Sequence, residues 1–367
     1  MINELIFYSI LIPVVITTAV SLYNFFTAPT IFNHETKLND DLISVLIPAR
    51  NEEKNIGKCL CALLRQTHSN LEILVLDDNS DDNTARIVKG FYKEEKRLRL
   101  IHGEPLPENW LGKNWACSQL SKHAKGNTLL FIDADVILTE HAITSAYNKF
   151  RKRKVKFLSV FPTQKINTFG SYLVTPLMNW VLLNFLPLRK VYSSPTKSFV
   201  AANGQFLLFD KETYNRIGGH ESVKDKVVED MELARILKSN GEKIITCVGG
   251  EAVYCKMYNQ FEDGVNGFSK NFFTGFKTSP GVFLLMLHLF LFIYFLPAVL
   301  SLVNFKYMYI VGLIVLSRIV ISIISRQNIL VNVLLHLPQM IVIYFVGWKS
   351  LINTLRGNIE WKGRRIS

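Results

Sequence analysis

Long stretches without a charged residue are the feature that most constrains how this chain folds. Residues 5–26 (LIFYSILIPVVITTAVSLYNFF) hold no Asp, Glu, Lys or Arg over 22 positions. As a helix this stretch is about 33 Å long, enough to cross a bilayer core of about 30 Å. It follows MINE rather than a basic segment, and it is long for a cleaved signal peptide. We therefore predict a retained membrane anchor over residues 1–27.

Three further apolar blocks lie near the C-terminus, at Val282–Val303, Tyr307–Ile324 and Ile329–Trp348. Three such blocks in succession are typical of membrane segments rather than of a soluble helical core. Another apolar run, Phe169–Leu188, contains prolines and asparagines, so we expect it at the membrane interface or in a core. The predicted organisation is an anchor at 1–27, a linker at 28–41, a folded domain at 42–278, membrane segments at 279–349 and a basic tail at 350–367.

The distribution of positive charge predicts the orientation. The net charge is +12, and basic residues gather at 149–157 (KFRKRKVKF) and in the tail. The positive-inside rule places both regions, and hence the domain, on the cytoplasmic side. Three crossings after a cytoplasmic domain would leave the tail outside. We therefore expect the block that holds Arg318 near its middle to be interfacial or re-entrant, because an arginine is costly in hydrocarbon.

The cysteines give no sign of a disulfide framework or a zinc site. Their number is odd and they form no CxxC pair; they are Cys59, Cys61, Cys117, Cys247 and Cys255. No histidines stand at ligand spacing around them. Free thiols are expected in a domain predicted to face the cytoplasm.

Alternating strand and helix signals occupy the first part of the domain. Apolar runs at 43–48 (ISVLIP), Leu71–Leu76 and Leu129–Ile132 are typical of buried strands, and Asn55–Gln66 has the pattern of an amphipathic helix. A second helix is expected to begin near Thr84. This order predicts a parallel α/β sheet, in which ligands bind beyond the carboxyl ends of the strands.

Acidic side chains follow these predicted strands at their carboxyl ends. Asp78 follows the second strand, and Asp133 and Asp135 follow the third. Neither a P-loop nor a GxGxxG fingerprint is present. Carboxylates at a phosphate site indicate a bridging divalent cation, Mg²⁺ or Mn²⁺, which takes oxygen ligands. The alternative is that the aspartates are helix caps and loop charges, and we favour it for Asp81 and Asp82.

Four motifs together resemble the family 2 inverting glycosyltransferases. They are PARNEE at 48–53, LDDNSDD at 76–82, FIDADV at 131–136 and VVEDMELARIL at 227–237. The resemblance implies a nucleotide-diphospho-sugar transferase (GT-A-like) α/β domain, here with flanking transmembrane helices. Three other segments narrow it to the membrane-bound branch that acts on lipid-like acceptors: PLPENWLGKNWA at 105–116, NGQFLLFDKETYNRIGGH at 203–220 and EWKGR at 360–364.

The resemblance implies a UDP-sugar site at the strand ends. Pro48, Ala49 and Glu52 would line the nucleotide pocket. Asp78 would hydrogen-bond the uracil, and Asp133 would contact the nucleoside. These are roles carried over from the family, position by position.

The remaining implied roles concern the diphosphate and the reaction. Asp135 would ligate the metal, and Lys113 would neutralise charge on the leaving diphosphate, a solvated loop lysine being the alternative. The pattern of 227–237 suits a helix with Glu229 and Asp230 in its first turn, where the helix dipole favours carboxylates. Asp230 is the predicted base, and a purely capping role is the alternative for one of the pair.

The resemblance further implies an inverting transfer of one sugar, which we expect to be glucose, in a bacterial cell membrane. It also implies that the acceptor is a lipid-like molecule in the bilayer, a carotenoid carboxylic acid of the 4,4′-diaponeurosporenoate type. Polyprenyl-phosphate, hopanoid and diacylglycerol are the alternatives. Processive relatives carry a QxxRW motif where this chain has NGFSKN at 266–271, which favours transfer of a single sugar. Residues expected on the acceptor side are Asn203, Gly204, Gln205, Glu229 and Lys270.

Two other classes of protein are weighed against this interpretation. A non-catalytic membrane scaffold is disfavoured because the acidic set Asp78, Asp133, Asp135 and Asp230 is intact. The positive charge alone would permit nucleic acid as a partner. No basic groove interleaved with aromatic residues and no nucleic-acid-binding motif is present, so we expect none.

Overall fold

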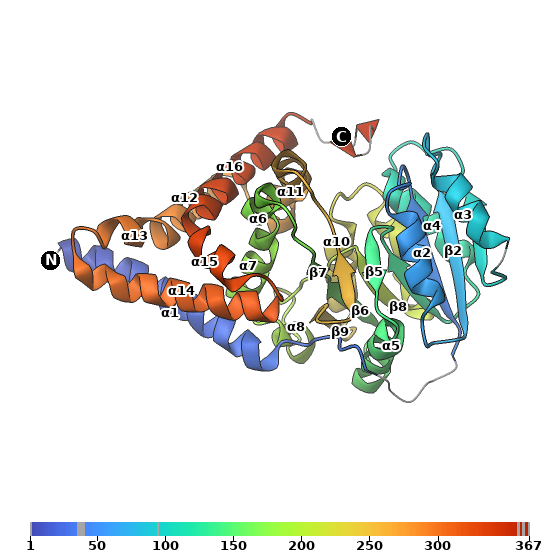
Figure 1. Ribbon diagram of the computed structural model, residues 1–367, viewed down its shortest axis with the longest axis horizontal. Helices are drawn as coiled ribbons and strands as arrows, with labels where there is room; N and C mark the ends of the chain where they lie inside the picture. The colour runs from blue at the N-terminus through green and yellow to red at the C-terminus, as the bar shows by residue number, and fades with distance from the viewer. Residues whose placement is uncertain (1, 35–40, 94, 358–359, 362–363, 366–367) are drawn as a thin grey trace. The chain divides into compact units, whose positions relative to one another are not determined.

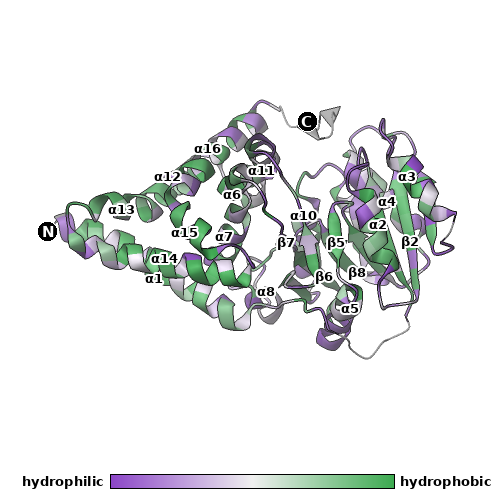
Figure 2. Cartoon of the chain, in the orientation of Figure 1, coloured by the Kyte–Doolittle hydropathy of each residue, from purple (hydrophilic) through white to green (hydrophobic). Residues whose placement is uncertain are grey.

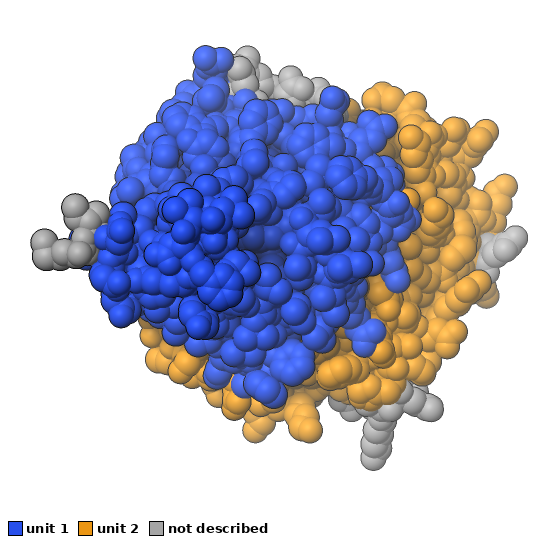
Figure 3. Space-filling model, turned by 60° about the vertical axis from the view of Figure 1, so that its left-hand side comes forward, with its two compact units in different colours: residues 1–28, 164–188, 257–367 blue, residues 29–163, 189–256 orange. Residues whose placement is uncertain are grey.

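The computed structural model describes residues 2–34, 41–93, 95–357, 360–361 and 364–365 (Figure 1). The chain divides into two compact units that interleave in the sequence (Figure 3). The helical unit comprises Met1–Ala28, Gln164–Leu188 and Met257–Ser367. The sheet unit comprises Pro29–Thr163 and Arg189–Lys256.

A seven-stranded sheet in the order β3-β2-β1-β4-β8-β6-β9 forms the centre of the sheet unit. Its first four strands are parallel, as the alternation of strands and helices predicts. They are β1 (Ile43–Ala49), β2 (Leu71–Asp77), β3 (Leu98–His102) and β4 (Thr128–Ile132), connected through α2 (Ile56–Leu64), α3 (Thr84–Tyr92) and α4 (Gly112–His123).

The sheet is mixed, which corrects the expectation of a parallel one. Strand β8 (Phe206–Asp210) runs antiparallel to both β4 and β6 (Phe157–Phe161), while β9 (Ile244–Val248) is parallel to β6. The direction of a strand depends on the path of the chain before it, and β8 follows a segment that belongs to the helical unit. A second pair, β5 (Val136–Leu138) and β10 (Val253–Cys255), is antiparallel.

The core of the sheet unit follows from the apolar patterns of its elements. Every residue of β4 is buried, as expected of a central strand covered on both faces. Helix α2 buries Ile56, Cys59, Leu60 and Leu63, whose spacing of three and four residues forms one apolar stripe. The other elements of this unit are α5 (Ala142–Arg153), α8 (Arg189–Ser193), α9 (Lys211–Arg216), the 3₁₀ turn Gly219–Val223 and α10 (Glu229–Ser239); β7 (Thr163–Gln164) lies where the chain leaves it. The cysteines are free, as predicted.

Apolar residues cover most of the helices of the helical unit (Figure 2). In the part of the chain that the structure describes, three helices are long and apolar enough to cross a membrane: Asn3–Thr27, Pro280–Leu300 and Phe305–Ile324. The elements of this unit are α1 (Ile2–Thr27), α6 (Phe169–Val174), α7 (Pro176–Phe185), α11 (Phe261–Phe276), α12 (Pro280–Tyr294), α13 (Leu296–Leu300), a 3₁₀ turn (Phe305–Tyr307), α14 (Met308–Ile324), α15 (Ile329–Leu334) and α16 (His336–Leu355), with the short strands β11 (Glu360–Trp361) and β12 (Arg364–Arg365) after them.

The structure differs from expectation in which apolar block forms a continuous helix. The block that holds Arg318 is the unbroken helix α14, whereas the last block is divided at Leu335 into α15 and α16. Pro338 explains the division. It has no N–H to donate to the carbonyl of Leu334, and its ring would clash with that carbonyl in a continuous helix. Length therefore qualifies the middle block as a span, and the orientation of the chain stays a prediction.

Candidate functional site

One backbone and one side-chain hydrogen bond join the segments at the carboxyl ends of β1 and β2. The amide of Asp78 donates to the carbonyl of Ala49 at 2.8 Å, and the Arg50 guanidinium donates to the carbonyl of Asp78 at 2.6 Å. The Asp78 side chain is buried, with 2% of its surface exposed. Pro48, Ala49 and Asp78 thus lie together, and their role in a nucleotide pocket stays a prediction.

Glu52 follows these strand ends in the loop before α2. Its amide donates to the Thr84 hydroxyl at 2.7 Å, and its Oε2 accepts from Asn55 at 2.8 Å. The charge of Glu52 is close enough to Asp135 to raise the pKa of that carboxyl. The first, second and fourth strands therefore bring the predicted nucleotide-site residues to one end of the sheet.

Lys113 lies between two carboxylates from different parts of the chain. Its Nζ is 2.9 Å from Asp133 Oδ1 and 3.1 Å from Glu229 Oε1. Burial lowers the pKa of Lys113, but the charges of Asp133 and Glu229 outweigh burial and raise it well above its usual value. The alternative of a solvated loop lysine is therefore wrong, since this ammonium is held in place.

Asp230 accepts a hydrogen bond at each carboxylate oxygen. Oδ2 accepts from the Gly204 amide and Oδ1 from the Met231 amide, both at 2.7 Å. Burial and the charge of Glu229 raise the pKa of Asp230 to about 7. A carboxyl with a pKa near neutrality suits general-base work near pH 7.

Position 204 leaves no room for a side chain, because charged groups lie close to the backbone there. A Cβ atom at this position would lie 2.9 Å from Lys113 Nζ and 3.0 Å from Glu229 Oε1. The same glycine donates its amide to Asp230. Gly204 therefore connects the predicted base with the lysine and its carboxylates, and we call Lys113, Asp133, Gly204, Glu229 and Asp230 the carboxylate cluster.

Asp135 has the features of a cation ligand. Its Oδ1 atom is buried and has no hydrogen-bond partner, and burial with the charge of Asp133 raises the pKa of this carboxyl to about 7. A bound divalent cation would compensate both features. No group of three or more His, Cys, Asp or Glu side chains is arranged around a metal within the described residues. Oxygens of a ligand would therefore complete the coordination shell.

Behind Asp135 lies a residue that the sequence analysis missed. Burial and the charge of Asp135 raise the pKa of the Cys255 thiol, whose sulfur accepts a hydrogen bond from the Gln205 side-chain amide at 2.8 Å. Asn203 accepts from the Gln205 backbone amide. Asn203 and Gln205 are buried, and their predicted role on the acceptor side stays a prediction, as does that of Lys270, on α11 of the helical unit. No local pattern around Cys255 indicates that its thiol lies near Asp135.

Asn114 was also missed, and it fixes the loop that leads to Glu229. This buried side chain donates to the carbonyls of Val223, Lys224 and Lys226 at 2.8, 3.2 and 3.0 Å. Its neighbour Lys113 contacts Glu229 just beyond that loop. The WLGKNWA segment therefore holds both the loop before α10, through Asn114, and the first residue of α10, Glu229, through Lys113.

Asn114→Ala is expected to lower the free energy of unfolding by about 1–3 kcal/mol, because it leaves buried carbonyls without a donor. Thermal unfolding of the detergent-solubilised protein would measure the change. Asn215→Ala, at an exposed position on α9, serves as the control and should unfold like the wild type. Equal melting temperatures for all three proteins would contradict the structural role of Asn114.

The raised pKa of Asp230 predicts a pH-dependent difference in stability. An unfolded chain releases this proton near pH 4, whereas the folded protein holds it to about pH 7. The stabilising contribution is thus present at low pH and lost as pH rises through 7. We therefore compare the melting temperatures of the metal-free Asp230→Asn variant and the metal-free wild type. The variant's value minus that of the wild type should increase by several degrees between pH 5 and pH 8. A difference that does not change with pH would contradict the raised pKa.

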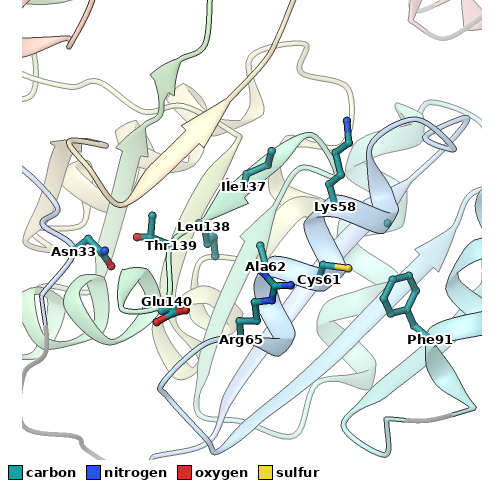
Figure 4. Close-up of a pocket in the computed structure, with 11 residues that line it drawn as sticks. Asn33, Lys58, Cys61, Ala62, Arg65, Phe91, Ile137, Leu138, Thr139 and Glu140 are labelled. Carbon is teal, nitrogen blue, oxygen red and sulfur yellow. The ribbon is translucent and has the colours of Figure 1, made fainter.

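A surface hollow lies elsewhere on the sheet unit (Figure 4). It has a volume of about 700 Å³ and is lined by α2, β5 and adjoining residues, among them Lys58, Cys61, Arg65, Phe91 and Ile137. It contains none of the predicted site residues. The chemistry of the carboxylate cluster therefore carries the functional assignment, and the hollow does not.

Comparisons with known proteins show which family and fold this chain resembles. Residues 44–214 match the sequence model of the family described as glycosyl transferase family 2. The 4,4′-diaponeurosporenoate glycosyltransferase of Staphylococcus aureus is 29% identical over 249 residues, which make up 66% of this chain and 62% of that relative. The chain thus aligns with less than two thirds of the relative's length.

A solved structure shows the same fold. A mannosyltransferase from Pyrobaculum calidifontis, in complex with GDP-Man and Mn²⁺, superposes with a TM-score of 0.54 at 16% identity, covering 96% of this chain and 95% of that one. This similarity supports the GT-A-like α/β domain expected from the motifs. Residues 44–214 therefore resemble a glycosyl transferase family 2 domain, in a chain that is similar to 4,4′-diaponeurosporenoate glycosyltransferase.

Proposed function

We propose that this protein is an inverting glycosyltransferase that moves a single sugar, glucose, from a UDP-sugar to a carotenoid carboxylic acid in the membrane. The observation that carries the proposal is the carboxylate cluster, in which Lys113 and Asp230 converge on Gly204. The name of the staphylococcal relative supports a carotenoid acceptor. The three apolar helices support an acceptor that partitions into a bilayer.

A divalent cation, Mg²⁺ or Mn²⁺, fits the residues present at the strand ends. Asp135 would hold it through the buried oxygen that has no partner, with Asp133 beside it. When bound, such a cation neutralises negative charge on the diphosphate of the donor. The solved mannosyltransferase contains Mn²⁺, which supports a metal of this class here.

Lys113 and Asp230 supply the two complementary charges of the reaction. The ammonium of Lys113, held by Asp133 and Glu229, adds a fixed positive charge near the leaving diphosphate. Asp230 faces the acceptor in this proposal. It takes the proton of a hydroxyl acceptor, whereas a carboxylic acid is already ionised near pH 7, so that Asp230 then orients the acceptor.

Transfer assays on the full chain in nanodiscs test this function. Labelled UDP-glucose, UDP-N-acetylglucosamine and GDP-mannose serve as donors. The acceptors are an apocarotenoid acid, the corresponding alcohol, a polyprenyl phosphate and diacylglycerol. We expect a glucosyl ester of the acid, identified by mass spectrometry, with the anomeric configuration of glucose inverted by NMR. A product formed only on the phosphate or on diacylglycerol would contradict the carotenoid acceptor.

The same assay separates an enzyme from a membrane scaffold. A scaffold would give no sugar transfer and no metal-dependent release of UDP with any donor. A retained configuration at the anomeric carbon would contradict the inverting mechanism while leaving the transferase assignment in place.

A further inference from the structure

A buried arginine in the helical unit has no part in the proposed transfer. Arg318 lies on α14 with 2% of its surface exposed, and it is among the largest fully buried side chains of the protein. An arginine keeps its proton at all physiological pH values. The helical unit therefore contains a permanent positive charge in a helix that is long and apolar enough to cross a membrane.

The contacts of Arg318 do not neutralise this charge. Its Nε donates to His336 Nδ1 at 2.9 Å, and because a guanidinium only donates, Nδ1 is the acceptor. His336 Nε2 then carries the proton and donates to the carbonyl of Tyr294 at 2.9 Å, so the imidazole is neutral. The guanidinium carbon lies 5.2 Å from the centre of the Trp180 ring, which covers one face.

The helical unit supplies no buried acid for this arginine. The sequence contains no Asp or Glu between residues 264 and 359. Among the side chains described in this unit, the carboxylates are Glu4, Glu262 and Asp263, and all three are exposed. Glu4 forms an ion pair with Lys306 at 2.6 Å. The Nη2 atom of Arg318 is buried without a hydrogen-bond partner.

A polar stripe leads along α14 from its C-terminal end towards Arg318. Ser322 and Ser325 follow Arg318 by four and seven residues and so lie on the same face of the helix. The hydroxyl of Ser325 is buried and without a partner. Arg318 is about 9 Å from the end of the helix at Ile324, at about 1.5 Å per residue. The stripe therefore places buried hydroxyls on the face of α14 that holds Arg318.

A buried, permanently charged group with an open donor is costly unless an opposite charge reaches it. Charged residues inside membrane bundles mark ligand sites for this reason. We propose that Arg318 binds the oxyanion of a membrane lipid, a carboxylate or a phosphate, through the guanidinium edge that Trp180 and His336 leave open. This site is independent of the donor and of the carboxylate cluster.

Thermal unfolding of the full-length protein in nanodiscs tests the proposal without any nucleotide sugar. The reference lipid is zwitterionic phosphatidylcholine, and the arms add phosphatidylglycerol, oleate, or oleyl alcohol as the uncharged control. We expect the melting temperature of the wild type to rise by several degrees with one of the two anionic lipids and not with the alcohol. A response to phosphatidylglycerol would identify the bound oxyanion as a phosphate, and a response to oleate would identify it as a carboxylate. No rise with either anionic lipid would overturn the proposal.

Substitutions separate a binding role from a packing role. Arg318→Met is expected to lose the response to the anionic lipid, and in phosphatidylcholine alone it should melt no lower than the wild type. Arg326→Met, at an exposed position on the same segment, is the control and should keep the response. An Arg318→Met variant that responds as the wild type does, or that loses the same stability in every lipid, would contradict the proposal.

Native mass spectrometry of the wild type gives a measurement that needs no variant. Protein released from mixed nanodiscs should retain one anionic lipid in preference to phosphatidylcholine. Retention without preference for the anionic lipid would overturn the site even if Arg318→Met does not fold.

Discussion

Asp230→Asn is expected to slow transfer to an alcohol acceptor by about 10²–10⁴-fold, the usual contribution of a general base. An amide cannot take the hydroxyl proton, although it occupies the same space beside the Gly204 and Met231 amides. Transfer to the matching carboxylic acid should fall by less than about tenfold, because that acceptor is already ionised near pH 7. Initial rates with both acceptors at saturating donor measure the two losses.

Asp225→Asn is the matched control for this substitution. Asp225 lies shortly before Asp230, and its exposed carboxylate pairs with Lys226. Its rates with both acceptors should equal those of the wild type. Equal losses on the two acceptors in Asp230→Asn would show that the carboxylate acts on the enzyme's structure or on the donor, not as a base.

Asp135→Asn is expected to remove most transferase activity with any acceptor. The substitution removes the charge of the buried oxygen that has no partner in the structure. Residues that only orient a metal ligand change affinity or activity by about 10–100-fold, so loss of the ligand itself should exceed that range. The dependence of UDP binding on Mn²⁺, measured by calorimetry, should disappear together with the activity.

Asp81→Asn serves as the control for the metal prediction. Asp81 stands in the same acidic segment as Asp78, but its side chain is 84% exposed. Its Mn²⁺ dependence should equal that of the wild type. If Asp135→Asn bound UDP with an unchanged Mn²⁺ dependence, the cation would lie elsewhere.

Local sequence patterns predicted the elements whose signals are contained within a few residues. The apolar runs at 43–48 and Leu71–Leu76 are β1 and β2, because strands covered on both faces are apolar throughout. The first-turn position of Glu229 and Asp230 on α10 was also predictable from its apolar spacing. Carboxylates that directly follow a strand must lie at its carboxyl end, so their location at the edge of the sheet needed no tertiary information.

Contacts between distant segments were not predictable in this way. Nothing near Lys113 indicates that its ammonium contacts Glu229, and nothing near Cys255 indicates that its thiol lies near the charge of Asp135. The motif around Gly204 could be recognised in the sequence. The need for a glycine there could not, because it arises from the space that Lys113 and Glu229 occupy. Such contacts depend on how the strands are ordered in the sheet, and β8 also took a direction that local pattern does not encode.

The apolar blocks near the two ends of the sequence determined by themselves that this chain has segments long and apolar enough for a membrane. Length and lack of charge suffice for that conclusion, because a bilayer selects on hydrophobic length. Only the tertiary structure decided that the last block breaks before Pro338, that Lys113 lies between two carboxylates, and that Arg318 is buried beside a neutral His336. These three depend on steric fit and charge between residues far apart in the chain, which no local pattern records.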